Sequence, residues 1–139
     1  MQNSIGIIGG TGPEGRGLAL RLGLAGLNVQ IGSRESRRAE EAATNILSLA
    51  RGIAVSGALN EIVAVSNSVV FLAVPYLAQR TTLERLKHCL SGKTVVVVAA
   101  PIEFSGGVAK VLHVTEGSAA LQVREILPDS AVASAFQTI

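Results

Sequence analysis

Three glycines near the amino end have the spacing that brings a peptide backbone close to a phosphate. They stand in the segment GTGPEG as Gly10, Gly12 and Gly15, after an apolar run and at the start of a segment with helical periodicity. In this pattern the first glycine permits a tight turn, the second admits a pyrophosphate, and the third lets the helix pack closely on the sheet. The sequence therefore predicts a dinucleotide site. The alternative is that these glycines make only a tight strand-to-helix turn.

Two residues of the predicted first helical turn bear on the anion. Pro13 suits this position, because the N–H that it lacks has no partner inside a helix. Glu14 favours the helix dipole, but its carboxylate would repel a phosphate. We therefore expect the Glu14 side chain to point into solvent and its backbone N–H to face the ligand.

The residues after the second predicted strand indicate which dinucleotide binds. An NAD site usually has an acidic residue there, about 20 residues beyond the glycines. This sequence has IGSRESRR instead, with Ser33, Arg34, Arg37 and Arg38. Guanidinium groups suit the doubly charged 2′-phosphate of NADP(H), whereas a ribose hydroxyl gains little from them. The alternative is a solvated helix start in which the arginines are partly neutralised by acidic neighbours, namely Glu35, Glu40 and Glu41.

The elements that would position these residues alternate along the chain. Apolar runs rich in β-branched residues alternate with helical patterns, which predicts a parallel sheet with helices on both faces. The expected fold is an α/β Rossmann-type sheet of six strands in the order 3-2-1-4-5-6, within one domain spanning residues 1–139. The predicted strands are Ser4–Gly9, Asn28–Gly32, Ile53–Gly57, Val69–Val74, Thr94–Ala100 and Ala131–Ala135. The predicted helices are Glu14–Ala25, a segment from an N-cap at Ser36 to Gly52, Asn60–Ser66, Thr82–Leu90 and Ser118–Leu127, and Ser105–Gly107 is expected to be a flexible turn.

Composition and charge exclude several other classes of protein. The chain has 139 residues, of which 48% are hydrophobic and 16% charged, so disorder is excluded. The net charge of +2 comes from scattered basic residues, which predicts no nucleic-acid partner. A single cysteine, Cys89, and two distant histidines give no disulfide and no metal-ligand spacing. No signal peptide, membrane span or hydrolase motif is present, and the expected location is the cytoplasm.

The segment IIGGTGPEGRGLALRLGLAGLNVQIGSRESRRAEEAA resembles the NADPH-dependent coenzyme F420 reductases, also called F420:NADP oxidoreductases. The likeness continues through FLAVPY and VVVVAAP to VASAFQTI. The resemblance implies an oxidoreductase that moves a hydride between NADP(H) and the deazaflavin of coenzyme F420, with no metal and no catalytic side chain. The matching positions are Thr11, Gly12, Pro13 and Glu14 at the phosphates, Ser33, Arg34 and Arg38 at the 2′-phosphate, Val74 beside the nicotinamide, and Pro75, Tyr76 and Gln137 to Ile139 near the deazaflavin.

Two departures from the family pattern leave alternatives open. Gln137 stands where the family often carries His, and an amide cannot titrate near neutral pH. The family's smaller, mostly helical C-terminal portion, which helps to join subunits, has no counterpart in this sequence, so we expect a fragment or a reduced relative. A homodimer is a further expectation. The alternatives are a non-catalytic NADP(H)-binding module or sensor, and a small imine or carbonyl reductase of related fold. For Tyr76, the alternative to a place at the cleft is a surface aromatic.

Overall fold

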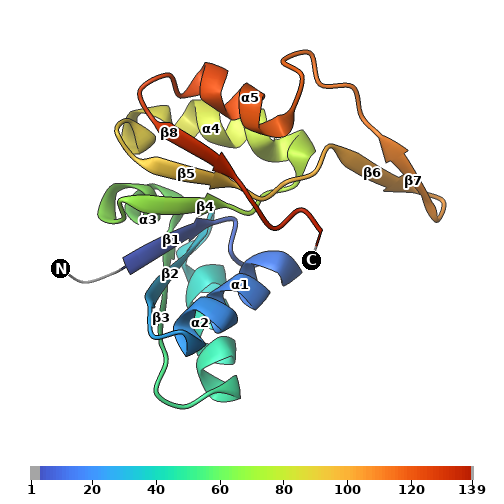
Figure 1. Cartoon of the computed structure of the whole chain (residues 1–139). Coiled ribbons are helices and arrows are strands. Elements are labelled where there is room, and N and C mark those ends of the chain that lie inside the picture. The colour runs from blue at the N-terminus through green and yellow to red at the C-terminus, as the bar shows by residue number, and fades with distance from the viewer. Residues whose placement is uncertain (1–3, 139) are drawn as a thin grey trace.

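A six-stranded parallel sheet forms the centre of the computed structural model, which describes residues 4–138 (Figure 1). The sheet consists of β1 (Ser4–Ile8), β2 (Asn28–Ser33), β3 (Ala54–Leu59), β4 (Val69–Leu72), β5 (Thr94–Val97) and β8 (Ala131–Ser134). Their spatial order is β3-β2-β1-β4-β5-β8, which confirms the predicted order 3-2-1-4-5-6 and the Rossmann-type fold. The order reverses between β1 and β4, and open parallel sheets bind ligands outside the carboxyl ends of the strands at that point.

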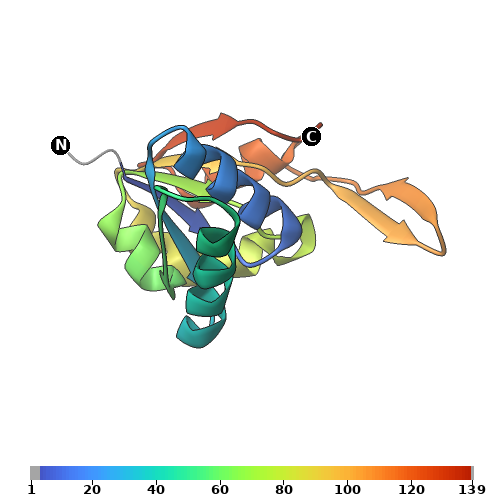
Figure 2. The same cartoon turned by 90° about the horizontal axis from the view of Figure 1, so that it is seen from below.

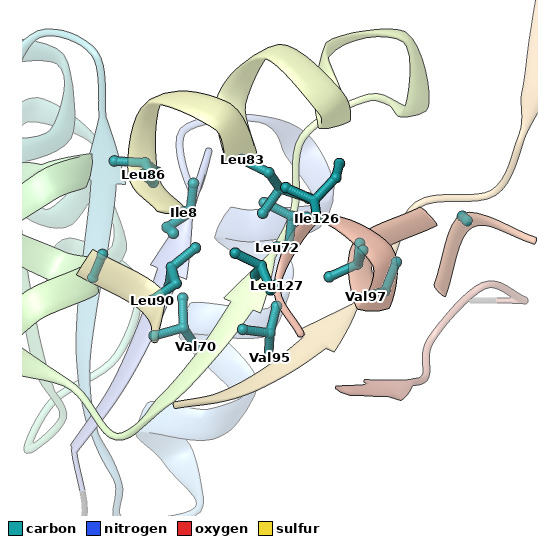
Figure 3. Close-up of a cluster of buried hydrophobic side chains, with 13 residues drawn as sticks. Ile8, Val70, Leu72, Leu83, Leu86, Leu90, Val95, Val97, Ile126 and Leu127 are labelled. Atoms are coloured by element: carbon teal, nitrogen blue, oxygen red, sulfur yellow. The ribbon is translucent and has the colours of Figure 1, made fainter. Parts of the chain in front are cut away.

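Helices cover both faces of this sheet. On one face α3 (Asn60–Ser66) packs on β1 and β2, and α4 (Tyr76–Leu90) and α5 (Ala119–Ile126) pack on β4 and β5. Figure 3 shows this core, in which Leu83, Leu86 and Leu90 meet the valine and leucine side chains of the strands. On the other face α1 (Pro13–Leu24) and α2 (Ser36–Leu49) enclose a second core. Ile7 belongs to the second core and Ile8 to the first, because successive residues of a strand point to opposite faces.

The start of α4 and the N-cap of α2 differ from the sequence predictions. Helix α4 starts at Tyr76, six residues before the predicted Thr82. The prediction started too late because Gln79, a fully buried polar residue one turn before Leu83, interrupts the apolar pattern of the helix. The prediction of Ser36 as an N-cap is also wrong, because Ser36 is the first residue of α2 and Glu35 precedes it as the cap. The Ser36 hydroxyl donates instead to Glu40 Oε1 at 2.8 Å.

Several predicted strands extended too far at their carboxyl ends. The run Val69–Val74 leaves the sheet at Leu72, and Thr94–Ala100 leaves it at Val97. The apolar residues beyond these ends line cavities: Ala73 and Val74 line one, and Val98 and Ala100 line another. Apolar character therefore continues past the strands because most of these residues both pack against the two cores and border cavities at the carboxyl edge of the sheet.

A β-hairpin that the sequence did not predict follows β5. It consists of β6 (Ile102–Ser105) and β7 (Val108–Val111), joined by Gly106 and Gly107, both with positive φ. The predicted flexible turn at Ser105–Gly107 is thus the tight turn of a hairpin, and residues 4–138 contain eight strands rather than six. All eight hairpin residues are exposed, and the hairpin projects from the body of the molecule in both views (Figures 1 and 2). None of the helices within residues 4–138 has the length and apolarity needed to span a membrane.

Candidate functional site

The glycine loop between β1 and α1 has room for a ligand at one glycine and none at the other two. A Cβ on Gly10 would lie 2.6 Å from Ile31 Cγ2, and a Cβ on Gly15 would lie 2.5 Å from the Gly10 Cα atom. Gly12 is different, because a Cβ there would meet nothing within 4 Å. The loop therefore packs tightly against the sheet at Gly10 and Gly15 and faces open space at Gly12.

The N-terminus of α1 lies beside this open space. Gly12 is the N-cap residue and Pro13 takes the first helical position, and no side chain caps the helix. Free N–H groups and a partial positive charge at such a helix end attract anions. The loop and helix together therefore have the geometry of a phosphate site.

One cavity of about 360 Å³ joins this loop to the arginine cluster. Its walls come from the glycine loop, the end of β2, α2, α3 and the start of α4, and we call it the main cleft. It is lined by Gly9, Thr11, Gly12, Ser33, Arg34, Arg38, Asn60, Ala73, Val74, Pro75, Ala78 and Thr82. Residues far apart in the sequence thus surround one space at the carboxyl edge of the sheet.

The arginines after β2 have different surroundings. Arg34 lines the main cleft, and among the described residues it forms no salt bridge. Arg38 also lines the cleft and lies 3.8 Å from the Glu35 carboxylate. Arg37 is bound to Glu41 at 2.8 Å, is 88% exposed and lies outside the cleft. The solvated interpretation therefore fits Arg37, whereas Arg34 and Arg38 are available to an anion in the cleft.

Ser33 sits at the base of the arginine cluster. The residue is buried, and its hydroxyl accepts a hydrogen bond from the Glu35 N–H at 3.3 Å. This short turn leads the chain from β2 into α2. It positions Arg34 beside the cleft, with the Ser33 hydroxyl among the groups that line it.

A second cavity, of about 260 Å³, adjoins the main cleft. Both cavities are lined by Arg34, Asn60, Ala78 and Thr82, so they are neighbouring parts of one depression. The further walls of the second cavity are Glu61, Thr81, Arg85 and Leu86.

A third cavity, of about 750 Å³, lies along α1 and is lined by both Glu14 and Gln137. Pro13 lines this cavity and Gly12 lines the main cleft, so adjacent loop residues border both spaces. The Gln137 amide donates to the Val97 carbonyl at 2.8 Å and to Ser134 Oγ at 2.7 Å. The Glu14 side chain is exposed at this cavity, and partial burial raises the pKa of its carboxyl above the usual range.

Tyr76 and Gln137, which the family resemblance placed around the same ligand, do not line the same cavity. The Tyr76 ring packs against the core between the sheet and α4 and α5, and its hydroxyl accepts from Gln122 Nε2 at 3.3 Å. It lines neither the main cleft nor the third cavity. Ile139, the last residue of the predicted set, lies outside the described residues.

The structure also brings residues into the site that sequence reasoning missed. Asn60, Ala78 and Thr82 line the main cleft, and Phe136 lines the third cavity. Asn60 could have been recognised in the sequence, because it is a polar residue directly after β3, where ligands bind at the carboxyl edge of a parallel sheet. No group of three or more potential metal-ligating side chains occurs within residues 4–138.

The fold and the cleft define a Rossmann-type domain, the class of parallel α/β domains that bind dinucleotides at the switch point of the sheet. The model of one family, the coenzyme F420-dependent NADP oxidoreductases, matches residues 4–101, and the chain belongs to this family. The resemblance seen in the sequence is thereby confirmed.

Relatives and solved structures agree with this assignment. The chain is 39% identical over 141 residues to the F420-dependent NADP reductase of Methanothermobacter marburgensis, covering 97% of this chain and 63% of that protein. The values for the F420-dependent NADP reductase of Methanocaldococcus jannaschii are the same. The chain thus spans about 63% of the length of these relatives.

Among solved structures, a protein from Arthrobacter sp. FB24, provisionally assigned as an F420-dependent NADP-reductase, superposes with a TM-score of 0.80 at 25% identity. That match covers 100% of this chain and 64% of the other. Lactate dehydrogenase from Eimeria maxima superposes with a TM-score of 0.67 at 13% identity, and the match covers 97% of this chain and 44% of the lactate dehydrogenase chain. This match shows a common fold alone.

Proposed function

We propose that this chain binds NADP(H) in the main cleft as one domain spanning residues 1–139, and that the protein is an oxidoreductase that transfers a hydride between NADP(H) and coenzyme F420. The observation that carries the proposal is that one cavity of about 360 Å³ is lined both by the open glycine loop and by Arg34 and Arg38, whose guanidinium groups suit a 2′-phosphate. The family membership of the chain supports the same activity.

Different residues of the chain would bind different parts of the dinucleotide. The N–H groups at the start of α1, with Thr11 and Gly12, would hold the diphosphate. Ser33, Arg34 and Arg38 would hold the 2′-phosphate by hydrogen bonds from a hydroxyl and two guanidinium groups. Val74 and Pro75 also line the main cleft and would contact the nicotinamide.

The deazaflavin would lie beside the nicotinamide, at the third cavity. Gln137 and Phe136 line that cavity. Both N–H groups of the Gln137 amide donate within the protein, so its oxygen would accept a hydrogen bond from an N–H of the ring. Ile139 and Pro75 remain proposed neighbours, whereas the place of Tyr76 against α5 gives it no contact with this cavity. Nicotinamide and deazaflavin supply the hydride chemistry themselves. The protein's part is to stack the two rings at reaction distance and to exclude water.

Isothermal titration calorimetry with NADPH and NADH tests the binding part of this proposal. We expect a clear preference for NADPH, and a titration with NADPH that gives no heat would refute the proposal. Mixing the protein with NADPH and oxidised F420 then tests catalysis through loss of the deazaflavin absorbance. Binding of NADPH without that loss would favour the non-catalytic NADP(H)-binding module.

We further propose a cytoplasmic homodimer without nucleic-acid or membrane partners. The net charge of +2 and the scattered basic residues support the absence of a polyanion partner. The exposed apolar residues of the hairpin, among them Phe104 at 77% and Val111 at 76%, support an interface between two copies, because an isolated two-stranded sheet is only marginally stable in water. Sedimentation equilibrium at several protein concentrations tests the subunit count.

A further inference from the structure

Asn60 is a buried polar residue at the point where the phosphate loop, the end of β2 and both adjoining cavities meet. It is the first residue of α3, directly after β3, and is only 7% exposed. It lines the main cleft and the second cavity. Neither the glycine motif nor the arginine cluster of the sequence accounts for it.

The oxygen of the Asn60 amide is committed to the phosphate loop. Oδ1 accepts a hydrogen bond from the Gly9 N–H at 3.3 Å, and Gly9 has a φ of +70° at the start of the turn. The same oxygen lies 2.5 Å from the position that a Cβ on Gly32 would occupy. The Gly32 carbonyl in turn accepts from the Gly10 N–H at 3.0 Å. Asn60 thus packs against β2 and holds the first residue of the loop.

The nitrogen of the same amide remains available. Among the described residues, Asn60 Nδ2 donates to no protein atom, and the only fully buried side-chain nitrogen or oxygen without a partner is Gln79 Oε1. Since Oδ1 points to the Gly9 N–H, the two N–H groups of Nδ2 point elsewhere, and the residue has its exposed surface in the two cavities. A primary amide whose oxygen is fixed by the backbone is a donor of defined direction.

From this arrangement we infer that Asn60 is a positioning residue that couples the phosphate loop to the bound dinucleotide: Oδ1 holds the Gly9 N–H while Nδ2 donates to an oxygen of the adenosine diphosphate moiety. This inference rests on the proposed binding of NADP(H) in the main cleft. The adenosine diphosphate moiety is common to NADPH and NADH, so Asn60 contributes affinity for both. Preference between them belongs to Arg34 and Arg38.

The variant Asn60→Asp separates the two halves of this role. A carboxylate has nearly the same shape and still accepts from the Gly9 N–H, but it cannot donate and it brings a negative charge towards the phosphates. We expect the melting temperature of the ligand-free protein to stay within about 4 °C of the wild-type value. We expect the dissociation constants for both NADPH and NADH to rise about 10- to 100-fold, and that for NADPH at least as much as that for NADH, because the carboxylate also repels the 2′-phosphate.

Asn67→Ala is the matched control. Asn67 is another buried asparagine, directly after α3 at the opposite edge of the sheet, and its amide donates to Gln30 Oε1 and the Val63 carbonyl. We expect this variant to lower the melting temperature while NADPH affinity changes less than about 3-fold at a temperature where it is folded. Asn60→Ala removes both the acceptor and the donor, so it should lower both the melting temperature and the affinity for NADPH.

Calorimetry on the wild type and these variants decides the matter. If Asn60→Asp binds NADPH within twofold of the wild type, or if it weakens NADPH but leaves NADH unchanged, the inference is overturned. If Asn67→Ala loses as much NADPH affinity as Asn60→Asp for the same decrease in melting temperature, the role of Asn60 is structural and the inference is overturned. If the wild type binds neither dinucleotide, the proposed function itself fails, which is a different outcome.

Discussion

Replacing Arg34 by alanine should convert a strong preference for NADPH into a weak one. The guanidinium lines the main cleft and forms no salt bridge among the described residues, so its removal breaks no ion pair within the protein. Charge-assisted hydrogen bonds contribute about 1.5–3 kcal/mol, which corresponds to a loss of roughly 10- to 150-fold in affinity. NADH has no 2′-phosphate, and its affinity should change less than about 3-fold.

Arg37→Ala is the appropriate control, because it removes the same charge three residues away. The Arg37 side chain is bound to Glu41 and lies outside the cleft. Its contribution to the ligand is a screened, through-solvent effect, and we expect less than a threefold change in NADPH affinity. Titration calorimetry of both variants with both dinucleotides provides the comparison. Equal weakening of NADPH and NADH by Arg34→Ala, or an effect of Arg37→Ala as large as that of Arg34→Ala, would refute the assignment of Arg34 to the 2′-phosphate.

Three further predictions concern the loop, the helix end and the core. Gly12→Ala should leave the melting temperature nearly unchanged, because the new Cβ meets no protein atom, yet weaken NADPH binding at least about 10-fold by occupying the open side of the loop. Gly15→Ala, whose Cβ would lie 2.5 Å from the backbone, should instead cost about 1–3 kcal/mol of stability, so equal melting temperatures for the two variants would contradict this account. Burial raises the pKa of Glu14, so the folded state binds its proton more tightly than the unfolded chain, and this contribution to stability is present at low pH and lost as the pH rises above about 4.3. Thermal melts at pH values below and above the pKa of Glu14 should show this loss of stability in the wild type and no such loss in Glu14→Gln. Leu83→Ala, at a fully buried position, should lower the free energy of unfolding by about 2–5 kcal/mol, whereas Leu77→Ala, at a 68% exposed position, should change it by less than about 0.5 kcal/mol in urea denaturation.

Local patterns predicted the main features of this fold because they have local physical causes. A strand, a glycine turn and a helix follow one another within the first 24 residues, and each needs only its own sequence to be recognised. The repeated alternation of strand and helix indicated a parallel sheet, and the strand order was predicted as the common arrangement of a doubly wound nucleotide domain. The replacement of the usual acidic residue by Ser33 and Arg34 was visible at a defined distance from the glycines.

Other elements were hidden because their partners are distant in sequence. Helix α4 begins at Tyr76 with Gln79 on its buried face, and that amide finds its partners 40 and 43 residues later, at the Ala119 carbonyl and Gln122. The β6–β7 hairpin has exposed residues on both faces, so no buried side imposes the alternation by which strands are recognised.

The sequence by itself determined that the amino end forms a glycine-rich turn between a strand and a helix, with a basic cluster after the second strand, because spacing along the chain sets the backbone geometry of a turn and the chemistry of its neighbours. Only the tertiary structure decided which side chains share a cavity. Asn60 reaches Gly9 across 51 residues, and Gln137 lines a cavity together with Glu14 and not with Tyr76. Such contacts depend on which strand ends lie side by side and on the direction in which each side chain leaves the sheet. Both are consequences of packing two helical layers on one sheet, and no local pattern carries them.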